Sequence, residues 1–230
     1  MKSTAIANTI LSSLPQSSSR WLESLEQVNL QAGAVLQEPD EEIKHVYFLE
    51  GAIVSIVSLS SEGASIQIGM VGYEGMVGVP AILGGVSPHR AVVHISGSAW
   101  RSSWRNLSAE FRKNPALQGL LLKYANTFLI QVAQSSVCNC YHPLQERLCR
   151  WLLIARDAAR SETFQITHEL VARLLGTRRA SITVAAGLLQ RAGLIKTGRG
   201  EIRILDRKGL EEMSCECYAV VRESVRRVQS

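Results

Sequence analysis

Apolar residues between Phe164 and Ile195 recur at the three- and four-residue spacing of two short amphipathic helices. Thr167 is placed to cap the first helix, and Gly176 interrupts the pattern before the second begins. The second helix is expected to bury one face, which consists of Ile182, Ala185, Ala186 and Leu189. Two such helices joined at a glycine predict a helix-turn-helix.

The opposite face of the second helix is expected to be exposed, and it carries Ala180, Thr183 and Val184. Arg178 and Arg179 stand at its N-terminal end, which in a recognition helix enters the major groove of DNA. There an arginine pairs bidentately with guanine, and small apolar side chains contact a thymine methyl group. Any helix pair with a glycine turn has a similar pattern, so the two helices alone leave a purely structural role open.

The segment from Leu194 to Leu205 predicts a β-hairpin that turns at Gly198-Arg199-Gly200. Such a hairpin beside a helix-turn-helix is a wing, and Arg199 at its tip is placed to reach a phosphate. The basic wing therefore favours DNA binding over the structural alternative.

The N-terminal half has a different pattern, because short apolar runs alternate with glycine turns from Val28 to about Trp104. Regular short strands of this kind predict an antiparallel barrel or jelly roll. A single helical turn is expected at Pro80–Leu83, between Gly78 and Gly84.

A long helix is predicted from Pro115 to about Cys138, with a loop from there to Pro143. Its apolar residues continue over about five turns, a length that favours association with a two-fold related helix. Packing on the jelly roll is the alternative. The residues predicted to form this dimer interface are Leu117, Leu121, Tyr124, Phe128 and Val132. One last helix, capped by Asp206 and continuing through Val225, is expected to cover the C-terminal domain.

The predicted fold class is α+β, with three parts. An N-terminal antiparallel jelly-roll β-barrel at 1–114 is followed by a dimerisation helix and hinge at 115–143 and a winged helix-turn-helix domain at 144–230. Residues 1–143 contain nine Lys/Arg and ten Asp/Glu, a net charge of −1, whereas residues 144–230 contain sixteen and ten, a net charge of +6. The basic C-terminal part is expected to bind a polyanion.

Composition excludes several classes of protein. The 230 residues are 46% hydrophobic, enough for real cores, but no apolar run is long enough to span a membrane. The apolar block at the start of the chain is too short for a signal peptide, and five cysteines do not suggest a disulfide framework. A cytoplasmic location is expected. No catalytic Ser/His/Asp or Cys/His arrangement is found, so an enzyme is not expected.

The order of these parts resembles the CRP/FNR family of bacterial transcription regulators, and ITHELVARLLGTRRASITVAAGLLQRAGLI is the segment that matches its helix-turn-helix most specifically. The resemblance implies a homodimer, a palindromic operator in double-stranded DNA and RNA polymerase as a partner. By position, it places base contacts at Arg179, Ala180 and Val184, and phosphate contacts at His168, Arg178 and Ser181. The full set predicted to contact DNA is His168, Thr177, Arg178, Arg179, Ala180, Ser181, Thr183, Val184 and Arg199.

Two departures from the family change these expectations. Family members commonly read a TGTGA-like half-site with an arginine, a glutamate and a second arginine, whereas only Arg179 is kept here, so a different operator is expected. The resemblance places an effector pocket at Gly78, Val79, Arg90, Ala91, Val132 and Ala133. Members that bind cyclic nucleotides have a glutamate in the place of Val79, which cannot accept a hydrogen bond from a ribose hydroxyl. Cyclic AMP is therefore not expected to bind, and the effector is unknown.

The cysteines begin at Cys138, so the N-terminal iron–sulfur cluster of some family members cannot form. The two Cys-x-Cys pairs, at Cys138 with Cys140 and at Cys215 with Cys217, could with His142 supply soft metal ligands. Their spacing lacks the two-residue gap of zinc sites, so ordinary thiols are favoured, and no metal or cofactor is predicted.

Two alternative functions of the whole protein stay open. One is a protein-interaction module whose helix-turn-helix does not touch DNA, and the other is a constitutive DNA-binding protein with a purely structural barrel.

Overall fold

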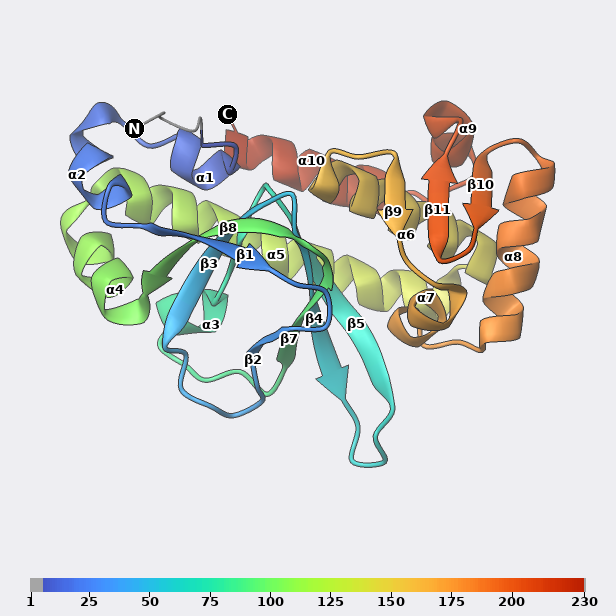
Figure 1. Ribbon diagram of the computed structural model, residues 1–230, viewed down its shortest axis with the longest axis horizontal. Coiled ribbons are helices and arrows are strands. Elements are labelled where there is room, and N and C mark those ends of the chain that lie inside the picture. Colours follow the sequence, from blue (N-terminus) through green and yellow to red (C-terminus); the bar gives the residue numbers. More distant parts are fainter. Residues whose placement is uncertain (1–5, 230) are drawn as a thin grey trace.

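The computed structural model describes residues 6–229 as a β-sheet lobe and a mainly helical lobe, joined by one long helix (Figure 1). The first five residues, on which the signal-peptide expectation partly rests, lie outside this range. No helix in residues 6–229 is long and apolar enough to cross a membrane.

The N-terminal lobe is built on two four-stranded antiparallel sheets, in the orders β1-β8-β3-β6 and β2-β7-β4-β5. Phe48 and Val54, one from each sheet, are fully buried in the same apolar core. The predicted antiparallel β fold of this lobe is therefore confirmed, and it takes the form of two packed sheets. The strands are β1 (Glu26–Leu30), β2 (Val35–Gln37), β3 (His45–Glu50), β4 (Ile53–Leu59), β5 (Ser65–Val71), β6 (Met76–Val77), β7 (Arg90–Ile95) and β8 (Gly97–Ser103).

The helices of this lobe are α1 (Thr9–Ser12), a 3-10 turn η1 (Gln16–Ser18), α2 (Ser19–Leu22), α3 (Val79–Ile82), α4 (Trp104–Lys113) and the long α5 (Pro115–Tyr141). Asn114 caps α5 by accepting a hydrogen bond from the Leu117 amide at 3.2 Å, and proline stands at the first helical position, where it needs no N–H partner. The loop predicted to begin at Cys138 is wrong. Nothing interrupts α5 before Pro143, so the helix continues through Tyr141.

The predicted dimer interface on α5 is also corrected by the structure. Leu117, Leu121 and Tyr124 are at most 2% exposed, because they pack into the core of their own jelly roll. Tyr124 also donates a hydrogen bond to the Met76 carbonyl at 3.2 Å. These three side chains are therefore not available to a partner chain.

The remaining two residues of that prediction, Phe128 and Val132, are half-buried. The Phe128 ring lies over Gly69 of β5, where an added Cβ atom would come within 2.5 Å of it, so only glycine fits. The opposite side of α5 is exposed and apolar. We call this side the outer stripe, which consists of Leu122, Leu129, Ala133, Val137 and Tyr141.

The C-terminal lobe contains α6 (Leu144–Ala159), β9 (Thr163–Gln165), α7 (His168–Leu174), α8 (Arg179–Arg191), β10 (Ile195–Gly198), β11 (Glu201–Ile204), α9 (Arg207–Glu212) and α10 (Cys217–Gln229). The single last helix that the sequence predicts is thus two helices. The cap is as expected, since Asp206 accepts a hydrogen bond from the Gly209 amide at 3.0 Å. After the break, α10 runs beside α5 (Figure 1), where Thr127 donates to the Ser224 carbonyl at 3.1 Å.

The two lobes are docked along β5. Trp151 of α6 donates through Nε1 to the side-chain oxygen of Gln67 at 2.7 Å, and the Tyr73 amide donates to the Ala158 carbonyl at 3.1 Å. Met70 of β5 is buried in the same apolar cluster as Leu152 of α6. The helical lobe is therefore held against the jelly roll by both polar and apolar contacts.

Candidate nucleic-acid interface

The predicted helix-turn-helix is present as α7 and α8. Thr167 caps α7 by accepting a hydrogen bond from the Leu170 amide at 3.2 Å, and Gly176 makes the turn with a φ of 62°. The apolar face that the sequence predicts for α8 is at most 5% exposed, at Ile182, Ala185, Ala186 and Leu189. These four side chains join the core of the C-terminal lobe and fix the orientation of α8.

The outward face of α8 is available for contact. Arg178, Arg179, Ala180, Thr183 and Val184 are all exposed, and the exposed fraction of the Val184 side chain is 64%. No salt bridge joins either arginine to another residue in the described part of the chain. Thr177 and Ser181, the remaining predicted residues of this turn, are half-buried. The N-terminal end of α8 therefore presents two unpaired cations beside small apolar side chains.

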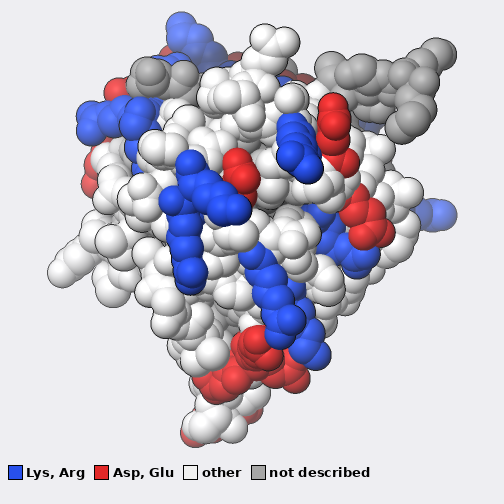
Figure 2. Space-filling view, turned by 90° about the vertical axis from the view of Figure 1, so that its left-hand side faces the viewer, with Lys and Arg blue, Asp and Glu red and all other residues white. Residues whose placement is uncertain are grey.

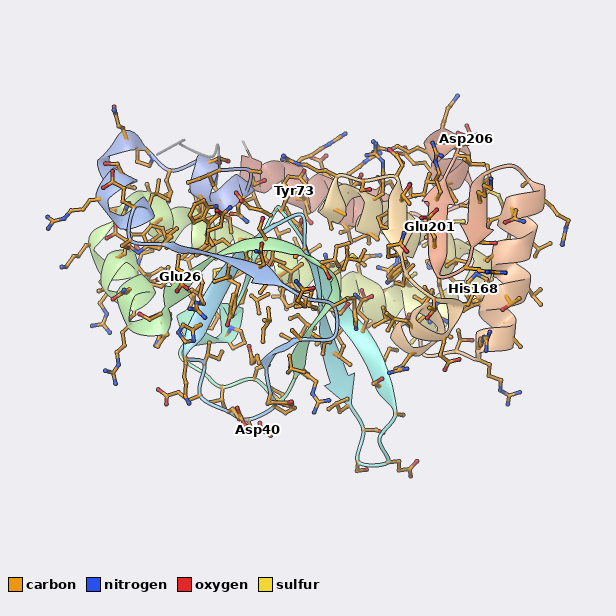
Figure 3. All side chains as sticks on the ribbon, viewed as in Figure 1. Glu26, Asp40, Tyr73, His168, Glu201 and Asp206 are labelled. Carbon is orange, nitrogen blue, oxygen red and sulfur yellow. The ribbon has the colours of Figure 1, made fainter. Side chains whose placement is uncertain are left out.

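His168, at the start of α7, lies beside α8 (Figure 3), with its Nδ1 atom 3.2 Å from the Thr183 hydroxyl. Thr183 in turn donates to the Arg179 carbonyl at 3.1 Å. Partial burial, and then the nearby Arg179 guanidinium, lower the pKa of His168. The imidazole is therefore mainly neutral at pH 7, and its hydrogen bond links the two helices.

The wing is the hairpin of β10 and β11, in which Gly198 pairs with Glu201 and the exposed Arg199 stands at the turn. Two features were not anticipated from the sequence. Strand β9 pairs with β11 to make a third strand, and Gln190 of α8 accepts hydrogen bonds from the Thr197 amide at 2.8 Å and hydroxyl at 2.7 Å. The glutamine thereby ties the wing to the recognition helix. Gln190 is a polar residue on the side of α8 nearest the hairpin, and this position in the sequence is the signal from which the contact could have been predicted.

Not all of the basic residues in the C-terminal lobe are available to a polyanion. Arg207 and Arg222 both pair with Glu211, at 2.8 and 3.1 Å. At the opposite end of the molecule, the face in Figure 2, basic and acidic side chains are scattered among neutral ones. Arg178, Arg179 and Arg199 are exposed and have no salt bridge in the described residues, so an external anion can reach them.

The predicted effector residues do not form one pocket. Gly78 and Val79 line an apolar cavity of about 50 Å³, whose other walls include Met76 and Phe128. Small-molecule sites are usually several hundred Å³, and the Phe128 side chain closes this one from the α5 side.

The other four predicted effector residues lie elsewhere. Arg90 is engaged by Glu38, with Nε and the carboxylate 2.7 Å apart, and Ala91 is buried in the sheet. Val132 is half-buried and Ala133 is exposed, and neither contributes to this cavity. The structure therefore does not bring the six residues together around one cavity, since Arg90 pairs with Glu38 and only Gly78 and Val79 line it.

Comparison with known proteins agrees with this geometry. Residues 146–213 match the Crp-like helix-turn-helix domain. The transcriptional regulator SdrP of Thermus thermophilus is 34% identical over 61 residues, which are 26% of this chain and 30% of SdrP, so the match spans less than a third of that relative.

Solved structures match over most of the chain. A regulator assigned to the CRP/FNR family from Eubacterium rectale is 19% identical with a TM-score of 0.66, over 89% of this chain and 96% of that one. A CRP-family regulator from Thermus thermophilus is 21% identical with a TM-score of 0.68, over 81% of this chain and 96% of that one. Residues 146–213 are thus a Crp-like helix-turn-helix domain, and the chain as a whole has the fold of these CRP/FNR-type regulators, with a β-sheet lobe, a long helix and a helix-turn-helix lobe.

Proposed function

We propose that this protein is a non-catalytic, cytoplasmic transcription regulator that binds a palindromic operator as a homodimer and acts together with RNA polymerase. Residues 1–114 form its sensor, 115–143 the dimerisation helix and hinge, and 144–230 the DNA-binding domain. The observation that carries the proposal is the N-terminal end of α8, where Arg178 and Arg179 are exposed and form no salt bridge within residues 6–229. This is the end of a recognition helix that enters the major groove.

The three arginines are expected to have different roles. Arg179 begins α8 next to the exposed Ala180 and Val184, so it is placed for a guanine edge, with the apolar side chains facing thymine methyl groups. Arg178 precedes the helix and Arg199 stands on the wing, positions suited to phosphates. The operator half-site should therefore contain one guanine with thymine nearby.

Replacing Arg179 with alanine is expected to cost about 1–3 kcal/mol on the cognate operator and to relax the preference at one base pair in each half-site. Replacing Arg199 should instead weaken cognate and random DNA alike and reduce the slope of log K against log salt by about one per arginine lost. A selection from a random duplex library identifies the operator. Titrations at several salt concentrations, with single-base variants, then measure both effects.

Arg105→Ala is the matched control, because Arg105 is an exposed arginine of the sensor lobe and the charge change is the same. It should leave both affinity and salt slope nearly unchanged. Equal weakening of every duplex by Arg179→Ala would remove the base-reading role.

One observation favours the second candidate function, a protein-interaction module. Val184 and Leu188 are 64% and 40% exposed, and with Leu144 they line a shallow apolar hollow on the outer side of α8. Such a surface also suits a protein partner. If the wild-type protein shows no preference among duplexes in the selection, this candidate replaces the transcription regulator.

The proposed effector of the sensor is not cyclic AMP. The cavity at Val79 is about 50 Å³ and apolar, and Val79 offers no acceptor to a ribose hydroxyl. Calorimetry with cyclic AMP is expected to show no saturable binding at micromolar concentration. Val79→Glu should not restore binding, since the Phe128 ring still fills the space. Tight binding by the wild-type protein would contradict this part of the proposal.

A further inference from the structure

Four potential metal ligands meet where α5 ends and α10 begins. The set, which we call the Cys3His cluster, consists of Cys138, His142, Cys215 and Cys217. Its three sulfur atoms and one imidazole nitrogen all lie within 4.8 Å of one another. The Cys138 and Cys215 sulfurs are 3.5 Å apart, and the Cys217 sulfur is 3.5 Å from Nδ1 of His142.

The continuation of α5 through Tyr141 explains this convergence. Cys138 and His142 are four residues apart, so the last helical turn and its C-cap place them on one side of α5. Cys140, by contrast, is exposed. The break between α9 and α10 brings Cys215 and Cys217 to the same point, 77 residues later in the chain. The cluster therefore contains one cysteine of the first Cys-x-Cys motif, both cysteines of the second motif, and one histidine.

The separations fit a tetrahedral ion better than a covalent bridge. A zinc ion with Zn–S bonds of about 2.3 Å and a Zn–N bond of about 2.0 Å has ligand atoms roughly 3.5–3.8 Å apart at the edges of the tetrahedron. A disulfide requires about 2.05 Å between sulfurs. Two of the separations, both 3.5 Å, lie at the short end of the zinc range, and none of the others exceeds 4.8 Å.

The surroundings of the cluster also match a metal centre. His142 turns Nδ1 to Cys217, while its Nε2 atom lies 3.3 Å from the Glu216 carboxylate. A carboxylate on the second imidazole nitrogen is the usual arrangement around metal-bound histidine. Gln134 donates to the Cys217 sulfur at 3.1 Å, which suits a thiolate acceptor.

A buried arginine balances the charge that such a centre would carry. Three thiolates and a zinc ion leave one negative charge on the cluster. Arg150 of α6 is only 5% exposed, and its Nε atom has no hydrogen-bond partner in residues 6–229. The Nη1 atom of Arg150 donates a hydrogen bond to the Ser135 hydroxyl at 3.3 Å, one turn before Cys138 in α5. A buried cation is therefore next to the anionic ligands.

We propose that the Cys3His cluster binds one zinc ion per chain in a closed, four-ligand site that fastens the C-terminal helix to the hinge. Four protein ligands leave no open position, which is the pattern of structural rather than catalytic zinc. Because α10 lies along α5 and follows α9 of the DNA-binding lobe, the ion cross-links the end of the long helix to that lobe. Metal occupancy thereby limits how far the DNA-binding lobe can move relative to α5.

The test uses full-length protein, purified with a reducing agent, stripped with a chelator and titrated with zinc against a chromophoric competitor. One equivalent of zinc per chain is expected, and cobalt(II) should give the intense spectrum of a tetrahedral, thiolate-bound ion. Zinc should raise the melting temperature in proportion to the logarithm of its free concentration.

Variants test each part of the site. Cys217→Ser should weaken zinc binding at least about 100-fold, and Glu216→Gln, which alters only the carboxylate on His142, about 10-fold. Cys140→Ser is the matched control, because Cys140 is an exposed thiol of the same helix end, and it should bind zinc like the wild type. Should Cys217→Ser fail to fold, Glu216→Gln decides, since the Glu216 side chain is 71% exposed.

Three results would overturn the proposal. The first is that the reduced wild-type protein binds no stoichiometric zinc. The second is an octahedral cobalt spectrum. Unchanged zinc affinity in both Cys217→Ser and Glu216→Gln would contradict the proposal equally. The third is a protein that binds no metal and yields a Cys138–Cys215 disulfide by mass spectrometry, which would make the cluster a thiol pair. None of these readouts depends on DNA, so the proposed regulator function is tested separately.

Discussion

Leu129→Glu is expected to produce monomers and to weaken operator binding by a factor of about 10²–10⁴, the usual advantage of two linked binding modules over one. Leu129 is the centre of the outer stripe on α5, and its side chain is 64% exposed in the single chain. In a two-fold pair of α5 helices it would be covered by the partner. A buried, unpaired glutamate would then cost several kcal/mol in every dimer.

The outer stripe suits this role better than the buried face of α5. Its first two members, Leu122 and Leu129, are seven residues apart, and Ala133, Val137 and Tyr141 follow at four-residue steps. Each of the five is exposed, and together they form an apolar line along most of the helix. Apolar surface repeated at this spacing is typical of helix pairing.

Sedimentation and operator titration of the same preparations measure the effect. Val220→Glu is the control, since Val220 is an apolar residue of α10, 42% exposed and outside the stripe. It should remain dimeric. Leu121→Ala should leave the dimer intact but lower the free energy of unfolding by about 2–5 kcal/mol, because it removes a fully buried side chain. An unchanged sedimentation coefficient for Leu129→Glu would show that α5 does not pair through this stripe.

The helix-turn-helix could be predicted because its signals are local. The Thr167 cap, the Gly176 turn and the buried face of α8 each depend only on residues close by in the sequence. Two short helices joined by a tight turn also have to pack against each other. The α5 prediction failed for the opposite reason. Periodicity correctly identified an apolar face at Leu117 and Leu121, but it cannot tell whether a second chain or the same jelly roll covers it.

The Cys3His cluster illustrates a second limit of sequence reasoning. Metal-site motifs are recognised by short spacings, whereas here Cys138 and Cys215 are 77 residues apart and come from different elements. Because α5 continues to Tyr141, Cys138 in its last turn and His142 at its C-cap lie on one side of the helix end, which a loop at Cys138–Pro143 does not predict. The effector site shows the same limit, because family position placed Arg90 near Val79, while an unforeseen contact with Glu38 engages it.

The free energy of unfolding is expected to fall as pH rises, because of the buried carboxyl group of Glu74. It lies in the turn between β5 and β6, where Oε1 accepts a hydrogen bond from the Gly72 amide at 2.9 Å. Its Oε2 atom is buried without a hydrogen-bond partner among residues 6–229. Burial raises the pKa of Glu74 from 4.5 to about 7.

The groups around Glu74 come from both lobes. Asp157 and Arg160 of α6 and its C-cap have opposing effects on the carboxyl group, and Tyr124 faces it from α5. The neighbouring Tyr73 lies at the junction between the sheet and the helical lobe (Figure 3), with the Arg160 guanidinium 3.4 Å from its ring centroid. Any opening that separates the lobes here exposes Glu74 to water.

The direction of the effect follows from the two protonation states. Below about pH 4.5 the carboxyl group is protonated in both folded and unfolded chains, so it contributes no pH dependence. Between about pH 4.5 and 7 the unfolded chain loses this proton and the folded chain keeps it, so the free energy of unfolding falls as pH rises. Each pKa unit is worth about 1.4 kcal/mol, and the total loss is therefore about 3 kcal/mol at pH 8.

Glu74→Gln should remove this loss, because an amide has nearly the shape of the protonated acid and never ionises. Urea denaturation at pH 5 and pH 8 is expected to show the variant about 2–3 kcal/mol more stable than the wild type at pH 8, with a much smaller difference at pH 5. Glu62→Gln, in the exposed turn between β4 and β5, is the control and should not change the pH dependence. If Glu74→Gln has the same effect at both pH values, Glu74 is already ionised in the folded protein, and the junction between the lobes must hold its charge in another way.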